Sequence, residues 1–168
     1  MRYLILILIL ASLGFSQNTP VDSPPLEAGV SHTLAKWRAA HYSDVRYKLN
    51  LTLEKMSPVL KGTIEIRVNV APQAETRPVG SVPLAPQIIL DWRKITGHEQ
   101  LSTISNVSFN GQPRAIRGGG AFQIQDAKPY IIEDREHLIF GDGVVAGENV
   151  IKLDFTSPIL TSGSAITR

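Results

Sequence analysis

The fold of this chain is decided by the stretch Val45-Arg-Tyr-Lys-Leu-Asn-Leu-Thr-Leu-Glu54, in which apolar and polar residues alternate without interruption. Because successive side chains of a β-strand point to opposite faces of a sheet, this alternation predicts one long, half-buried strand. The run Lys61–Val70 has the same pattern, with isoleucine or valine at alternate positions from Ile64 onward. The two runs therefore predict an antiparallel strand pair, joined by a turn around Met56-Ser-Pro58.

Further strands must share the core of this pair, because two strands alone bury too little apolar surface to offset the loss of backbone entropy. Turn-forming residues, of which Asn110-Gly111 is the clearest hairpin signal, separate further apolar segments. We expect additional strands at Gln87–Trp92, Ile104–Phe109, Ala121–Gln125, Glu136–Phe140 and Asn149–Phe155.

A short helix is expected ahead of the first strand. Ser31 can cap it, Leu34 and Trp37 lie on it, and it should end near the Tyr42-Ser-Asp44 turn. The predicted fold class is therefore all-β, a saddle-like antiparallel β-sandwich with one short N-terminal helix.

The first thirty residues do not share this pattern. Arg2 precedes an apolar run from Leu4 to Leu10, and small residues follow as far as Ser16. We interpret residues 1–16 as a secretory signal peptide, because the apolar run is far shorter than the roughly 20 residues that a membrane-spanning helix needs. Residues 17–30 are expected to be a flexible linker, and residues 31–168 the folded domain. The protein should thus be exported, to the periplasm or the extracellular space, without a membrane anchor after cleavage.

The charge distribution and the cysteine content exclude one class of partner and one source of stability. Lys and Arg number 17 and Asp and Glu 15, with both signs interspersed along the chain, whereas nucleic-acid-binding proteins usually cluster their positive charge. No nucleic-acid partner is therefore expected. The sequence contains no cysteine, so its stability after export must come from its core and not from disulfides.

The patterns that could bind a metal are incomplete. His98-Glu99 begins like the zinc-binding motif His-Glu-x-x-His, but Ser102 stands where the second histidine is required. Gly97 before this segment favours a surface loop. The other histidines, His32, His41 and His137, are isolated in the sequence, which is typical of packing or surface residues.

Other catalytic patterns are equally weak. The sequence has no Gly-x-Ser-x-Gly segment for a serine nucleophile. Gly118-Gly-Gly120 lacks the Lys-Ser/Thr ending of a phosphate-binding loop, and Glu133-Asp-Arg-Glu136 is a mixed-charge run typical of a solvent-exposed turn. We therefore assign no catalytic, cofactor-binding or metal-binding residue in this chain.

Several segments occur in an order that suggests a family. They are Arg38-Ala-Ala-His-Tyr-Ser-Asp-Val-Arg-Tyr-Lys-Leu-Asn-Leu-Thr-Leu53, Leu60-Lys-Gly-Thr-Ile-Glu-Ile-Arg-Val68, Ile89-Leu-Asp-Trp92, Ile104-Ser-Asn-Val-Ser-Phe-Asn-Gly111, Glu136-His-Leu-Ile-Phe140 and Val145-Ala-Gly-Glu-Asn-Val-Ile-Lys-Leu-Asp-Phe155. This succession resembles the amino-terminal β-domain of the zinc aminopeptidase N family, and the resemblance extends over residues 34–168. It rests on the order of the segments, since each one alone is a common strand-and-turn pattern.

The resemblance implies that this chain is a fragment of an exported zinc metallo-aminopeptidase, a hydrolase. In the full-length enzyme, zinc and a glutamate would activate water against the first peptide bond of a peptide substrate. The family's Gly-x-Met-Glu-Asn and His-Glu-x-x-His segments have no counterpart here, so this chain alone should be inactive and hold no cofactor. It would form one wall of the peptide-binding cleft, and the surface that packs against the catalytic domain should appear on this chain as an exposed apolar patch.

An alternative hypothesis is a free-standing secreted β-sandwich that binds a carbohydrate or a protein. Such a module should have a row of exposed aromatic side chains or a polar groove. A small enzyme that uses His98 and Glu99 is a third hypothesis.

Overall fold

Two β-sheets and one helix make up the computed structural model, which describes residue 24 and residues 26–72, 86–118 and 130–160. The elements in chain order are α1 (His32–His41), β1 (Tyr42–Leu53), β2 (Val59–Val70), β3 (Ile88–Asp91), the 3-10 turn η1 (Glu99–Leu101), β4 (Thr103–Phe109), β5 (Gln112–Pro113), β6 (Ala115–Gly118), β7 (Tyr130–Asp134), β8 (His137–Phe140) and β9 (Gly147–Pro158). The mostly-β class and the short N-terminal helix that the sequence predicts are both confirmed.

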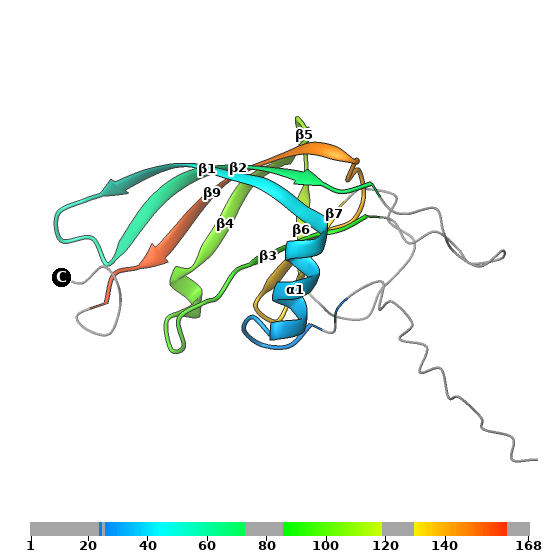
Figure 1. The fold of residues 1–168 in the computed structure, drawn as a ribbon. Helices are drawn as coiled ribbons and strands as arrows, with labels where there is room; N and C mark the ends of the chain where they lie inside the picture. Colours follow the sequence, from blue (N-terminus) through cyan, green and yellow to red (C-terminus); the bar gives the residue numbers. More distant parts are fainter. Residues whose placement is uncertain (1–23, 25, 73–85, 119–129, 161–168) are drawn as a thin grey trace, which may run out of the picture.

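The larger sheet has five strands in the order β1-β2-β9-β4-β5, and the smaller has four in the order β3-β8-β7-β6. Within the described residues all strand pairs are antiparallel except β6 with β7, which is parallel. Figure 1 shows the larger sheet arching over the smaller one, with α1 descending from the start of β1. The end of the larger sheet that carries the β1–β2 hairpin extends beyond the smaller sheet.

The register of the larger sheet gives it one apolar and one polar face. Tyr47 of β1 lies opposite Ile66 of β2, and Ile66 lies opposite Ile151 of β9. Because opposed residues of an antiparallel pair share a face, the apolar positions of all three strands face inward, toward the smaller sheet. We call this side the inner face and the other the outer face.

The core lies where the two sheets overlap. Ile66, Val68, Phe109 and Ile151 of the larger sheet are buried there. The smaller sheet contributes a second set of buried side chains, Ile88, Ile131, Leu138 and Phe140. The rings of Phe109 and Phe140 meet across the sandwich at a centroid distance of 5.4 Å, which places aromatic packing at the centre of the core.

Local signals predict most elements. Ser31 caps α1, its side chain accepting a hydrogen bond from the Leu34 amide at 3.1 Å, and Asn110-Gly111 forms the β4–β5 turn with φ values of 49° and 79°. The turn predicted at residues 42–44 is wrong, because Tyr42 already belongs to β1. In place of a turn, the strand has a β-bulge between Ser43 and Arg46.

Some predictions fall outside the described residues, namely the strand at 121–125, the signal peptide at 1–16 and most of the linker at 17–30. The α1 helix is ten residues long, and no helix in the described ranges is long and apolar enough to cross a membrane.

Candidate functional site

The inner face of β1 is solvent-exposed. Its five apolar side chains, Val45, Tyr47, Leu49, Leu51 and Leu53, are between 44% and 64% exposed, and we call them the open face. The prediction of a half-buried strand is therefore wrong for β1, although it holds for β2, where Ile66 and Val68 are buried. The physical reason is that β1 is the edge of the larger sheet, and the smaller sheet covers the strands further in.

A groove continues from the open face into the space between the sheets. One hollow of about 280 Å³ lies between β1 and β3 and is lined by Tyr42, Val45, Tyr47 and Ile88 among others. A second, also of about 280 Å³, is lined by Tyr47, Leu90, Trp92 and Phe155 among others. Both linings include Tyr47, so the two hollows adjoin the open face there, and both include the charged Asp91 in an otherwise mostly apolar lining.

Phe155 and Gly62 shape the floor of this surface. A Cβ atom on Gly62 would lie 2.5 Å from the ring of Phe155, closer than any side chain could approach without displacement. Glycine at this position therefore lets the ring lie directly over β2. Trp92 packs edge-on against the same ring at a centroid distance of 6.4 Å, which joins the β3 side of the groove to the floor.

A charged cluster fixes the helical end of the groove. Arg38 of α1 donates two hydrogen bonds to Asp91 at the end of β3, at 2.8 and 2.7 Å. His137, whose side chain is fully buried, lies 3.1 Å through Nδ1 from Asp91 and 2.8 Å through Nε2 from the carbonyl oxygen of Glu27. The cluster thus ties α1 and the segment before it to β3 and β8.

The charge of Asp91 is stabilised by this arrangement. Partial burial acts to raise the pKa of its carboxyl, but the hydrogen bonds and positive charge of Arg38, together with His137, hold that pKa below the usual value. Asp91 therefore stays ionised at neutral pH and keeps its bonds to Arg38.

Tyr42 anchors the start of β1 to the smaller sheet. Its hydroxyl donates to the carbonyl oxygen of Gln87 at 3.0 Å and accepts from the amide of Ile89 at 2.9 Å. Burial raises the pKa of the phenol to about 12. The same side chain lines the hollow between β1 and β3.

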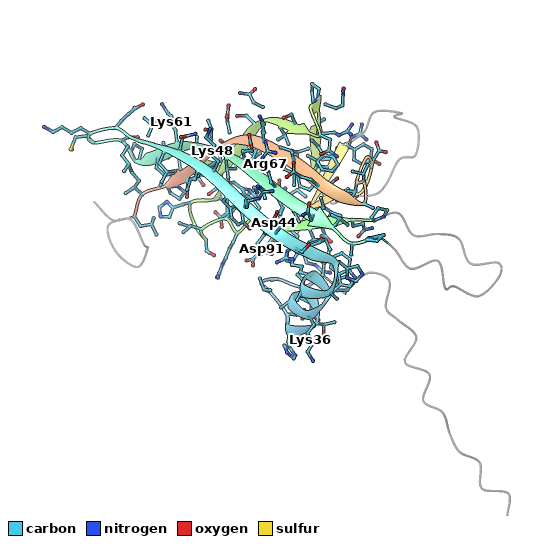
Figure 2. The ribbon with its side chains drawn as sticks, turned by 45° about the horizontal axis from the view of Figure 1, so that its top comes forward. Lys36, Asp44, Lys48, Lys61, Arg67 and Asp91 are labelled. Atoms are coloured by element: carbon cyan, nitrogen blue, oxygen red, sulfur yellow. The ribbon has the colours of Figure 1, made fainter. Side chains whose placement is uncertain are left out.

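The outer face of the larger sheet is polar. Figure 2 shows Lys48, Lys61 and Arg67 on it. Glu148 of β9 pairs there with both Arg46 and Arg67 at 2.9 Å. A hydrogen bond from Lys152, and to a smaller extent one from Arg67, holds the pKa of the Glu65 carboxyl below its usual value. These exposed pairs contribute little stability, but they distinguish a solvated face from the apolar one.

The candidates for metal binding and catalysis are not brought together. His98 precedes the exposed η1 turn, as the surface-loop interpretation predicts, and Ser102 follows that turn. His32 is exposed at the start of α1, and His41 lies at its end with Nδ1 2.7 Å from the Trp37 carbonyl oxygen. Within the described ranges, no three His, Cys, Asp or Glu residues lie where they could hold a metal ion.

The remaining candidates lie in the smaller sheet. Gly118 ends β6, and the rest of its glycine run lies outside the described residues. Glu133 and Asp134 end β7, so only Arg135 and Glu136 form the turn that the mixed-charge run predicts. Glu133 pairs with Lys94, which is a structural contact and indicates no acid–base site.

Comparison with known proteins adds no family assignment, because no family model and no curated protein matches the chain. The likeness to the aminopeptidase N family thus stays a prediction from the order of its segments. The open face and its groove are the feature of the described residues that most needs a functional explanation.

Proposed function

We propose that this chain is the N-terminal β-domain of an exported zinc metallo-aminopeptidase, and that its open face packs against the catalytic domain of the same protein. The proposal rests on the resemblance of its ordered segments and on one structural observation. Five apolar side chains of a single strand are exposed on the side that its neighbours use for the core. Exposed contiguous apolar surface of this kind marks an interaction site.

The energetics favour an apolar partner for this surface. Completing the burial of a half-exposed leucine or valine contributes about 1 kcal/mol, so the five residues together would stabilise a domain interface by several kcal/mol. Among the five, only Tyr47 is aromatic. A carbohydrate platform built on stacked rings is therefore less well supported than an apolar domain interface.

In the complete enzyme this domain would contribute to catalysis by positioning the substrate. It would form one wall of the peptide-binding cleft and help to hold the substrate relative to the zinc site, which restricts the substrate without any bond-making residue in this chain. Zinc and its ligands would belong to the catalytic domain, where the metal activates the attacking water.

The reading frame beyond the Arg168 codon tests this proposal. We expect it to stay open and to encode a His-Glu-x-x-His segment, and we expect the product of the whole frame, but not this chain, to hydrolyse aminoacyl anilides in the presence of zinc. A stop codon with no such segment would favour the free-standing binding module. Zinc-dependent turnover by this chain alone would contradict the proposal and favour an enzyme that uses His98 and Glu99.

A further inference from the structure

We propose that the free edge of β1 pairs antiparallel with β1 of a second copy of this chain, about a two-fold axis that passes through Asn50. The two larger sheets would then join into one continuous sheet. This inference concerns the edge of β1, whereas the proposed function concerns its inner face. It goes beyond that function and does not depend on it.

From Arg46 onward, the edge of β1 has no bulge, no proline and no inward-pointing charge, which are features that normally prevent such pairing; its outward-pointing Lys48 is a feature of that kind. Within the described residues β1 pairs only with β2, so one row of its backbone groups is open over a twelve-residue strand. Natural edge strands are usually short, bulged, interrupted by proline or given inward-pointing charges. The bulge of β1 is confined to Ser43–Arg46. From Arg46 to Glu54 there is no proline, and every inward residue is apolar.

Charge complementarity and the length of strand that can pair together select the register. With the axis at Asn50, Arg46 of each copy lies opposite Glu54 of the other, and Lys48 lies opposite Thr52. This gives two opposite-charge pairs on the outer face, where such directly opposed pairs are stabilising. Both side chains already pair within their own chain, Arg46 with Asp44 and Glu148 and Glu54 with Lys61. These pairs are exposed and weak, and the Arg46 and Glu54 side chains are 57% and 56% exposed, so both can turn toward the copy without leaving a buried position.

Neighbouring registers are less favourable. An axis at Lys48 places this lysine opposite its own copy, and an axis at Leu49 places Arg46 opposite Thr52 without any opposite-charge pair. An axis at Leu51 pairs Lys48 with Glu54 but moves Arg46 opposite the hairpin turn of the copy. A slip by one residue would set inward residues against outward ones. Only the axis at Asn50 pairs the whole run from Arg46 to Glu54.

The inner face also fits this arrangement. Leu49 would lie opposite Leu51 of the copy, and Tyr47 opposite Leu53, so the apolar side chains of both strands meet across the new pair. A two-fold contact of this type is self-complementary and closed, which gives a dimer and no further growth along this edge. The open faces of the two copies would become neighbours on the same side of one sheet.

Charge reversal tests the register. The dimer dissociation constant, measured by sedimentation equilibrium, should rise at least about tenfold in Arg46→Glu and in Glu54→Arg, since each change turns both opposite-charge pairs into like-charge pairs. The double variant R46E/E54R should restore the value to within about threefold of the original. Lys152→Glu on the outer face of β9 is the matched control, because it reverses an exposed charge away from the edge, and it should leave dimerisation unchanged.

Single cysteines give an independent test, because the chain has none of its own. Asn50→Cys should form a disulfide-linked dimer under mild oxidation, whereas Lys48→Cys and Thr52→Cys should link efficiently only when mixed. A chain that stays monomeric up to about 1 mM, or that cross-links in another pattern, would overturn the proposal. Neither result would affect the reading-frame test of the proposed function.

Discussion

Replacing His137 by alanine should lower the free energy of unfolding by about 3–5 kcal/mol. The side chain is fully buried, so its removal leaves a cavity, and the cost of such truncations falls in this range. The substitution also removes the hydrogen bonds that tie β8 to Asp91 and to the Glu27 carbonyl oxygen, which lowers the stability of the folded state further. Urea unfolding followed by tryptophan fluorescence would measure the loss, since Trp92 lies directly after β3.

His32→Ala is the matched control for this prediction. His32 is exposed on α1, and surface substitutions of this kind usually change stability by less than about 0.5 kcal/mol. Hydrogen exchange adds a second measurement, because loss of His137 should also weaken the attachment of α1 to β3 through Asp91 and Arg38. A His137→Ala variant within about 1 kcal/mol of the original chain would show that the cluster does not hold the sheets and the helix together.

Replacing Tyr42 by phenylalanine should cost about 1–3 kcal/mol at neutral pH. The Tyr42 hydroxyl accepts the amide hydrogen of Ile89 and donates to the carbonyl of Gln87, and its loss leaves both backbone groups partly unsatisfied. Tyr47→Phe provides the control, since Tyr47 is 64% exposed and the loss of its hydroxyl should leave stability nearly unchanged.

The same hydroxyl should also make stability depend on alkaline pH. The folded chain keeps the phenol proton until about pH 12, whereas the unfolded chain releases it near pH 10. Between these values the unfolded state binds fewer protons, so stability falls as the pH rises, by about 2–3 kcal/mol in total from this group. Tyr42→Phe should lose less stability than the original chain between pH 9 and 12, and equal losses in the two proteins would contradict this explanation.

The sequence predicts the long elements well because their signals are local and repeated. Alternation over β1 and β2 locates each strand to within a few residues and assigns the correct side chains to the inner face. The apolar segment predicted at Asn149–Phe155 lies within β9. The capping Ser31 and the Asn110-Gly111 turn each depend on neighbouring residues only, and both lie where they were expected.

Shorter elements and burial could not be predicted in the same way. Strands β5 and β6 span two and four residues, too few for a period to be recognised, and the parallel pairing of β6 with β7 depends on the path of the chain between them. The exposure of β1 is also not local. Alternation shows that Leu49 and Leu51 share a face with Leu53, but whether anything covers that face depends on a distant sheet.

The charged cluster has no sequence signature at all. Arg38, Asp91 and His137 come from three elements separated by about fifty residues each, and no spacing rule connects them. The interpretation of the isolated histidines as packing or surface residues is consistent with the buried His137 and the exposed His32, but the partners of His137 become visible only in the folded chain.

Thiol labelling of a Leu51→Cys variant tests most directly whether β1 presents an open docking face. The chain has no other cysteine, so the labelling rate reports on this position alone, and Ile151→Cys in the fully buried core is the comparison. At concentrations where the chain is monomeric, we predict that Leu51→Cys reacts nearly as fast in the folded protein as in urea, while Ile151→Cys is strongly protected. Equal protection at the two positions would mean that the inner face of β1 is already covered, and would contradict the account.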